Sequence, residues 1–439
     1  MAKPQKKYSN LNKREIKYLK DLLGIKKVQD IDITILKQLK EKLKKLKDVR
    51  CKNMIWYKQW DIIMCVILAS FADNNDWTDI HDFVEDNYKW FKSFLQMTGG
   101  IPTAGTYERV MGLVDSNELN TILFDFFKTI TFKQTPEVNL ANIDGRVNNG
   151  SKKNSTILSD AKTPLNCLNV YLNEYGYCAS TTQIDEKSNE IPAVEDVVSS
   201  MDLTGIIVTW DALNTQIKNV DAVINSGGDY IVPVKGNQGT IHANLVEYFD
   251  QKRREEIIAG NSQSQYFTYT EKSHSCIIKY ELFLTSDINW YCKKDDWEGL
   301  KSFGYVRKII TKKVYEKSTR KNAKNKDKKV PKIKTVVEER YYISSRQVNI
   351  SEFNNATRKH WNIENKVHWH LDFTFCQDDN STTNKKALLN LEIIHKFVLA
   401  VLERVKPRYK TSLKKIRKHL SRDFEEFFPE LICYLLLKN

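Results

Sequence analysis

Three carboxylates stand where they could bind divalent cations, whose preferred protein ligands are oxygen atoms. Asp211 directly follows residues 205–210, a β-branched run typical of a strand buried on both faces. Asp144 follows a second apolar run at residues 138–143. Active sites of α/β sheets gather at the carboxyl ends of strands. Taken alone, however, either aspartate is better explained as a helix cap or a turn former.

The third carboxylate, Glu364, stands in a segment where apolar residues recur at helical spacing. Trp361 and Val367 lie three residues away on either side, so Glu364 belongs on or next to the buried stripe of that helix. A carboxylate there is costly unless a base or a metal ion compensates it. His360 and His368, four residues away on either side, could supply that compensation locally.

The same segment raises zinc as an alternative metal. His360, His368 and His370 all lie near Glu364. Their spacing does not match the HExxH zinc motif. A histidine-rich helix is more often structural than metal-binding, so zinc is the weaker interpretation.

The elements around the two aspartates predict a mixed sheet with helices on its faces. Residues 136–239 contain three strands and then an alternation of helix, strand, helix and strand. We expect the strand at residues 230–234 to lie at a sheet edge, because Pro233 cannot donate a ladder hydrogen bond. A long helix over residues 351–371 is expected to carry Glu364.

The remaining sequence predicts three further parts. Residues 1–135 form an all-helical domain, residues 240–335 a mostly β insertion, and residues 406–439 a helical tail after the second part of the core at residues 336–405. In the first domain Lys37, Lys40 and Lys44 are spaced to give one positive helix face. Contact with a nucleic acid and simple solvation explain that face equally well.

Charge favours a nucleic-acid partner. The 69 Lys and Arg residues outnumber 55 acids and give a formal net charge of +14. A basic host proteome or a solubility requirement would explain the excess too. Residues 312–334 concentrate Lys and Arg with only two acids, Glu316 and Asp327. We expect this run to contact the DNA backbone, the alternative being a solvated hairpin tip.

Cysteine usage and hydropathy favour a reduced, intracellular protein. The eight cysteines include no CxxC pair and no zinc-ligand spacing. The polar N-terminal residues lack the apolar core of a signal peptide. Residues 62–72, the most apolar stretch, are too short to span a bilayer, so we expect a buried helix and no membrane partner.

Several segments resemble, in order, the motifs of bacterial insertion-sequence transposases of the H-repeat-associated (ISAs-type) family. LANIDGR, which contains Asp144, is similar to the first motif, and GIIVTWDALNTQ, which contains Asp211, to the second. RKHWNIENKVHWHLDFTF resembles the last motif and carries Glu364. Further similar segments are residues 73–115, 183–198, 227–242 and 338–345. Agreement of several motifs in order is more specific than any single one.

This resemblance implies a fold, a reaction and a site. The fold is an RNase H-like α/β mixed sheet flanked by helices, with a mostly β insertion before the last catalytic helix and an N-terminal all-helical domain. The triad is Asp144, Asp211 and Glu364, with Mg²⁺ as cofactor and Mn²⁺ able to substitute. The reaction is cleavage at the ends of an insertion sequence, followed by attack of the new 3′-hydroxyl on target DNA. No covalent protein–DNA intermediate is needed.

The chemistry explains why carboxylates are used. Two divalent ions roughly 3.5–4 Å apart activate the nucleophile and stabilise the leaving oxygen of an in-line displacement. We expect Asp144 to bridge both ions, with Asp211 on one and Glu364 on the other.

Ten side chains are expected to contact DNA, and the first three named here could instead support the active site. Lys235, Asn237 and Gln238 follow a strand and should lie near the strand ends, although a plain turn is the alternative. The full set is Arg146, Lys235, Asn237, Gln238, Lys321, Lys324, Lys328, Lys329, Arg358 and Lys366.

Three departures from the family pattern leave the triad intact. Arg146 stands where the family usually has lysine, Asn149 replaces a basic residue, and Gln377 replaces a glutamate. They leave room for a catalytically inactive or domesticated DNA-binding relative. A related RNase H-like nuclease without strand transfer is the other alternative.

The resemblance also implies partners and a location. The substrates are double-stranded DNA, both the inverted repeats of the element and the target. Such enzymes work as a homodimer or a larger assembly on paired ends. A bacterial, cytoplasmic and nucleoid-associated location is expected.

Overall fold

The computed structural model describes residues 11–27, 30–152, 164–184, 190–260, 263–273, 276–317 and 329–437. The chain forms two compact units. Unit 1 consists of Met1–Val138, Asp144–Glu190 and Asn362–Asn439, and unit 2 of Asn139–Ile143 and Ile191–Trp361. One of the points where the chain passes between them lies inside strand β1 (Leu140–Asn148), between Ile143 and Asp144.

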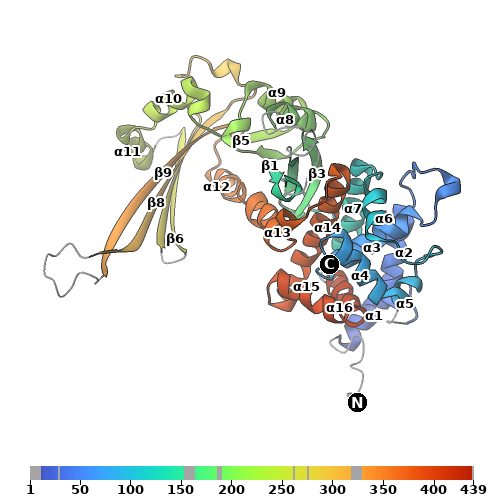
Figure 1. Cartoon of the computed structure of the whole chain (residues 1–439). Coiled ribbons are helices and arrows are strands. Elements are labelled where there is room, and N and C mark those ends of the chain that lie inside the picture. The colour runs from blue at the N-terminus through green and yellow to red at the C-terminus, as the bar shows by residue number, and fades with distance from the viewer. Residues whose placement is uncertain are drawn as a thin grey trace. The chain divides into compact units, whose positions relative to one another are not determined.

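Unit 1 is mostly helical, as expected for the first part of the chain (Figure 1). Before the first strand, the described residues form α1 (Lys13–Leu23), α2 (Ile31–Leu43), α3 (Gln59–Phe71), α4 (Trp77–Asp86), α5 (Tyr88–Lys92), α6 (Ala104–Met111) and α7 (Ser116–Thr131). Short polar residues begin several of these helices. Asn12 caps α1 in a capping box with Glu15, and Asp76 caps α4 through the backbone amides of its first turn.

Helix α14 (Lys385–Tyr409) is the central element of unit 1 and packs against α3, α6 and α7. Its first turns are buried on all sides, which explains the continuous apolar character of this stretch. Polar groups inside it have partners, since Asn390 Nδ2 donates to the carbonyls of Met111 and Val114. Helices α13 (Trp369–Phe373), α15 (Leu413–Arg422) and α16 (Phe424–Leu437) complete this unit.

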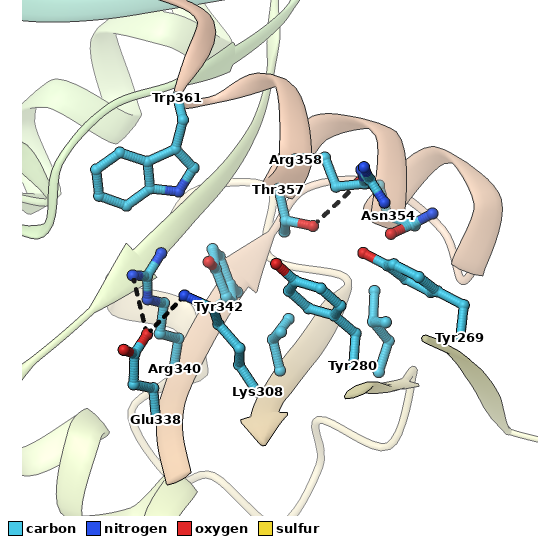
Figure 2. A pocket seen from close by; sticks show the side chains of 12 residues that line it. Tyr269, Tyr280, Lys308, Glu338, Arg340, Tyr342, Asn354, Thr357, Arg358 and Trp361 are labelled. Atoms are coloured by element: carbon cyan, nitrogen blue, oxygen red, sulfur yellow. Dashed lines mark hydrogen bonds and ion pairs between the residues drawn. The ribbon is translucent and has the colours of Figure 1, made fainter. Parts of the chain in front are cut away.

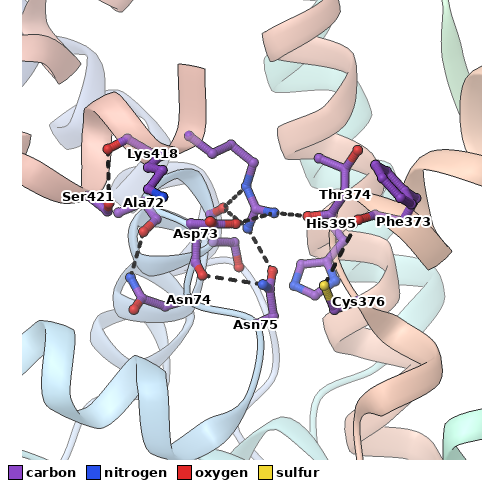
Figure 3. A network of polar contacts seen from close by, with 12 residues as sticks. Ala72, Asp73, Asn74, Asn75, Phe373, Thr374, Cys376, His395, Lys418 and Ser421 are labelled. Carbon is purple, nitrogen blue, oxygen red and sulfur yellow. Dashed lines mark hydrogen bonds and ion pairs between the residues drawn. The ribbon is translucent and has the colours of Figure 1, made fainter. Parts of the chain in front are cut away.

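A buried arginine joins three parts of unit 1 (Figure 3). Arg417 on α15 donates to the carbonyls of Ser70 and Thr374 and to Asn75 Oδ1. Its guanidinium also lies 3.0 Å from Asp73 Oδ1. Burial lowers the pKa of Arg417 to about 10, so the side chain stays charged at neutral pH. These contacts tie α15 to the ends of α3 and α13.

The strands of unit 1 pair side by side. Strand β1 is the hydrogen-bonded neighbour of β2 (Leu165–Leu172), and β2 pairs antiparallel with β3 (Tyr177–Ile184). Every residue of β2 is buried, as in a strand covered on both faces.

Unit 2 contains a mixed sheet. Counted from the first residues of β1, the order is β1, β4 (Ile207–Thr209), β5 (Asp229–Val234), β9 (Lys329–Ser344), β8 (Ser302–Lys317), β7 (Cys276–Thr285) and β6 (Ser264–Ser273). Strands β1, β4 and β5 are parallel, and the others are antiparallel. The mixed α/β prediction is confirmed. The strands of the expected β insertion extend the same sheet.

Helices lie on both faces of this sheet. They are α8 (Glu190–Ser199), α9 (Ile217–Asn225), α10 (Gly239–Tyr248), α11 (Gln251–Ala259) and α12 (Ile350–Lys359). Phe353 of α12 packs edge-on against Tyr342, whereas Phe249, after α10, stacks on Tyr305. Tyr305 of β8 lies opposite Tyr341 of β9, so these two side chains point to the same face of the sheet. Tyr342 follows Tyr341 in β9 and therefore points to the other face. Helix α12 and the end of α10 therefore cover opposite faces.

The edge-strand prediction for residues 230–234 is wrong. Strand β5 lies between β4 and β9 and pairs with both. Its proline is tolerated because the last registered pair with β4 is Val208 with Tyr230, three residues before Pro233. The Pro233 carbonyl instead accepts a hydrogen bond from Thr215 Oγ1 at 2.7 Å. No ladder bond from β4 is lost at the proline.

Two further features concern the surface and the thiols. Within the described part of the chain, no helix combines the length and apolar character needed to cross a membrane. The stretch at residues 62–72 falls mostly within α3, which is almost entirely buried, as expected. All eight cysteines are free.

Candidate active site

Asp144 lies within β1 and not at its end, which corrects the sequence expectation. The strand continues to Asn148 because it still pairs with β2 after its pairing with β4 has stopped. The last registered β1–β4 pair is Asn142 with Thr209. Asp144 therefore lies two residues beyond the last registered β1–β4 pair.

The predicted helix over residues 351–371 is interrupted. Helix α12 ends at Lys359, and a π-helical turn spans Glu364–His368 before α13 begins. In that turn the Trp369 amide donates to the Glu364 carbonyl, five residues back. Such π turns are rare and often mark functional sites.

Glu364 does not lie on a buried stripe, contrary to the sequence expectation. Its side chain is 55% exposed. Val367 is buried, but Trp361 is 45% exposed, because the helix break separates the two residues that would have framed the stripe. Glu364 therefore needs no compensation for burial.

Asp144 and Glu364 nevertheless come together in unit 1, with His368 between them. The three side chains offer ligand atoms that all lie within 4.8 Å of one another. His368 Nδ1 is 3.1 Å from Glu364 Oε2 and 3.5 Å from Asp144 Oδ2. The hydrogen bond from His368 lowers the pKa of Glu364 below its ordinary value, so this carboxylate is ionised at neutral pH.

This donor set fits a hard divalent cation. Two carboxylates separated by a few ångströms supply the anionic oxygens that Mg²⁺ and Mn²⁺ prefer. Two of the histidines considered for zinc are bonded elsewhere. His370 Nδ1 lies 2.9 Å from Thr374 Oγ1, and His360 Nδ1 lies 3.2 Å from Thr209 Oγ1.

Arg146 lies in the interior of unit 1 and has no surface to offer to DNA, because its side chain is only 4% exposed. It forms ion pairs with Asp372 and with the buried Glu392. Burial alone would lower the pKa of Arg146, but these two carboxylates outweigh it and raise the pKa. The expected DNA contact of Arg146 therefore does not fit its buried position, and its observed partners are Asp372 and Glu392.

A second buried charge pair lies on α14. Glu392 and Lys396 stand one turn apart, and their charged atoms are 2.7 Å from each other. Burial opposes ionisation of Glu392, but Lys396 and Arg146 outweigh it and lower its pKa. These residues were not anticipated. Charged residues inside an otherwise apolar helix were the available signal.

The departure at Gln377 has a structural explanation. Its Oε1 accepts from Arg146, and its Nε2 lies 2.9 Å from His395 Nδ1. A glutamate could accept from Arg146 but could not donate to the histidine nitrogen. Asn149, the other polar departure, donates its backbone amide to Asp378.

Asp211 belongs to unit 2, where it follows β4 as expected. Its Oδ1 accepts from the Ala212 amide, and its side chain is 56% exposed. Lys235 Nζ lies 3.3 Å from the same oxygen. An exposed ion pair of this kind adds little to the stability of the fold. Its main consequence is that a positive charge lies next to Asp211.

The loop after β5 is tied to the segment that follows Asp211. Asn237 Nδ2 and Gln238 Nε2 both donate to the Ala212 carbonyl, and Gln238 also donates to that of Thr215. In this conformation the two amides hold the loop in place. Lys235 is left as the cation next to Asp211.

Arg358 lines a cavity of about 460 Å³ in unit 2 (Figure 2). Its guanidinium pairs with Glu271 at 2.5 Å and lies over the Tyr269 ring. On another wall, Arg340 stacks over Trp361 with 4.8 Å to the ring centroid. The cavity is therefore walled by aromatic rings and partly neutralised cations.

The remaining basic candidates lie partly outside the described residues. Lys321, Lys324 and Lys328 belong to residues 318–328, and the side chain of Lys329 is likewise not described. Lys366 is exposed within the π-helical turn. Of the N-terminal lysines, Lys40 donates to the Phe94 carbonyl.

Comparison with known proteins identifies the class. Residues 170–400 match the family model described as "Transposase DDE domain", and residues 40–127 match the one described as "DDE_Tnp_1-associated". The first match spans more than half of the chain. The chain therefore belongs to the transposase DDE domain family.

Relatives place it more closely. It is 28% identical over 356 residues to the H repeat-associated putative transposase YhhI of Escherichia coli K12, covering 78% of this chain and 84% of the relative. It is 26% identical over 376 residues to the putative transposase YncI of Escherichia coli O157:H7, covering 85% and 89%. The chain is thus a member of the H-repeat-associated DDE transposases, and the resemblance is confirmed.

A solved structure is also similar in part. The piggyBac transposase, in a synaptic complex with hairpin DNA, is 12% identical and matches 91% of this chain and 78% of its own, with a TM-score of 0.34. A TM-score this low does not establish that the two proteins share a fold.

Proposed function

We propose that this chain is an active DDE transposase that cuts DNA at the ends of its element and joins those ends to target DNA. Asp144, Asp211 and Glu364 are its catalytic carboxylates, on an RNase H-like core with the helical N-terminal domain and β insertion expected from the sequence. The observation that carries the proposal is the convergence of Asp144 and Glu364, which are distant in sequence, onto ligand atoms within 4.8 Å.

Strand register supports the addition of Asp211. Parallel strands β1 and β4 pair Asn142 with Thr209. Asp144 and Asp211 each stand two residues beyond this pair in the sequence, Asp144 within β1 and Asp211 after the end of β4.

The chain's residues prepare this site for divalent ions, which when bound activate the attacking oxygen and stabilise the leaving one. Asp144, Asp211 and Glu364 would hold them. The hydrogen bond from His368 lowers the pKa of Glu364 and so favours its charged form. Lys235, beside Asp211, is placed to contact a phosphate of the DNA backbone. Nothing in this scheme requires a serine or tyrosine nucleophile.

DNA contacts extend beyond the carboxylates. Lys366 and Arg358 flank Glu364 in sequence, and Lys321, Lys324, Lys328 and Lys329 belong to the basic run. Each adds a charge that can displace a counterion from DNA. We further propose that the enzyme acts on double-stranded element ends and target DNA as a homodimer or a larger assembly.

A cleavage and joining assay tests the proposal. The full chain is incubated with Mg²⁺ or Mn²⁺ and linear DNA that carries the genomic segments flanking its reading frame. We expect cleavage at the element ends and joined products. Glu364→Gln should lose both while still binding the DNA, and Glu85→Gln, at an exposed carboxylate of α4, should keep both. Cleavage without joining would identify a nuclease, and no cleavage with either metal would identify an inactive relative.

A further inference from the structure

A line of hydrogen bonds runs from the buried pair on α14 to the candidate site. Lys396 Nζ lies 2.7 Å from Glu392 Oε1, 2.5 Å from Asn169 Oδ1 and 3.0 Å from Thr181 Oγ1. Asn169 on β2 in turn reaches His368, with 3.2 Å between its Nδ2 and His368 Nε2. Lys396, Glu392, Asn169 and His368 are all buried.

The chemistry of Lys396 determines which way Asn169 faces. An ammonium group can only donate, so the Asn169 oxygen faces Lys396 and its NH₂ group faces His368. That NH₂ group can also only donate. His368 Nε2 must therefore be the acceptor and carry no hydrogen.

The tautomer of His368 follows. A neutral imidazole with an acceptor at one nitrogen carries its hydrogen on the other, here Nδ1. Nδ1 faces Glu364 Oε2 at 3.1 Å and Asp144 Oδ2 at 3.5 Å. The opposite tautomer would direct an Nε2–H group at the Asn169 NH₂ group inside the protein, where neither hydrogen would have an acceptor.

We infer that Glu392, Lys396 and Asn169 make His368 a positioning residue that donates Nδ1–H to the two carboxylates, and not a third metal ligand. The ligand atoms of Asp144, Glu364 and His368 lie close enough together to suggest a three-ligand metal site. Both ring nitrogens of His368, however, are already engaged in hydrogen bonds, one with Asn169 and the other with Glu364. The metal-related part of this inference rests on the proposed function. The tautomer does not.

The tautomer is measured directly on the full chain labelled with ¹⁵N-histidine. Long-range ¹H–¹⁵N spectra distinguish the two tautomers, and the His368 signals are those missing from His368→Gln. We expect hydrogen on Nδ1, without metal and without DNA. Hydrogen on Nε2 would overturn the inference. Because neither DNA nor cleavage is involved, failure here is distinguishable from failure of the proposed function.

A polarity exchange at Asn169 gives a second reading. In Asn169→Asp the carboxylate accepts from Lys396 and also from His368, so His368 Nε2 should now carry a hydrogen. Asn169→Leu keeps a similar volume without either role. An unchanged tautomer in a folded Asn169→Asp variant would contradict the relay.

Mn²⁺ binding tests the positioning role. Pulsed electron paramagnetic resonance of the Mn²⁺-loaded protein should show no imidazole nitrogen coupled to the ion. An imidazole coupling that disappears in His368→Asn would make His368 a ligand and overturn the inference. Positioning partners of this kind are worth about 10–100-fold in metal affinity. We expect that loss in His368→Gln but only a few-fold change in His368→Asn, whose amide nitrogen takes the place of Nδ1; equal losses in both would contradict the role.

Discussion

His368 Nδ1 lies 3.1 Å from Glu364 Oε2, at opposite ends of one π-helical turn. The exposed glutamate thus gains a buried partner that holds it toward Asp144. Asn169 contacts the other ring nitrogen of His368, and Lys396 donates a hydrogen bond to Asn169. Stability of the interior and geometry of the site are therefore linked through side chains of α14.

Removing one member of the buried charge pair should destabilise unit 1. Lys396→Met leaves Glu392 buried with less compensation, and breaking such a pair costs about 3–5 kcal/mol. Urea unfolding should show this loss in the free energy of unfolding. Lys406→Met, on the same helix, breaks the more exposed pair with Glu403 and should cost only about 0–1 kcal/mol. Equal effects would contradict the assigned burial.

Gly304 should tolerate no side chain. A Cβ there would lie 2.5 Å from the Phe353 ring, which packs α12 onto the sheet of unit 2. Gly304→Ala should therefore lower the free energy of unfolding by about 1–3 kcal/mol, as overpacking does in other cores. Gly236→Ala is the matched control, since a Cβ there meets no atom within 4 Å. A neutral Gly304→Ala would show that Phe353 does not pack as described.

His395 should make stability depend on pH. Burial, with Arg417 and Arg146 nearby, lowers its pKa well below 6.5. The unfolded chain therefore binds a proton that the folded chain excludes, so this contribution is complete above pH 6.5 and is lost as the pH falls below it. In His395→Asn, the slope of unfolding free energy against pH between about pH 6.5 and 5 should decrease by up to ~1.4 kcal/mol per pH unit. An unchanged slope would place the titration elsewhere.

The basic run should set the salt dependence of DNA binding. Changing Lys321, Lys324, Lys328 and Lys329 together to alanine should weaken binding to any sequence. It should also reduce the slope of log K against log salt by ~0.9 for each phosphate that the variant no longer neutralises. A control changes the uncharged neighbours Ser318, Asn322 and Asn325 to alanine. An identical slope in both variants would remove this run from the DNA interface.

Much of the organisation was readable from the sequence because local patterns determined it. The switch from helical spacing before Pro136 to β-branched runs predicted β1, β4 and β5 and placed the start of each within two residues of where it lies. The triad candidates came from strand ends and motif order, and two of them meet in unit 1.

What could not be predicted depends on contacts between distant segments. Strand β5 can lie inside the sheet because its pairing with β4 stops at Tyr230, before Pro233 is reached. No local sequence pattern shows where that pairing stops. The break between α12 and the π-helical turn was hidden because Trp361 and Val367 keep helical spacing across it. Arg146 was assigned to DNA because its partners, Asp372 and Glu392, are remote in sequence.

We propose that Asp211 binds divalent ions together with Asp144 and Glu364, and metal-dependent cleavage by Asp211→Asn tests this most directly. Loss of one carboxylate from such a site should slow cleavage by about 10³-fold or more, since the ions contribute several kcal/mol of charge stabilisation. We expect this loss with binding to element-end DNA retained, and normal cleavage by Asp196→Asn, at an exposed carboxylate of α8. Cleavage by Asp211→Asn at the wild-type rate with Mg²⁺ would contradict it.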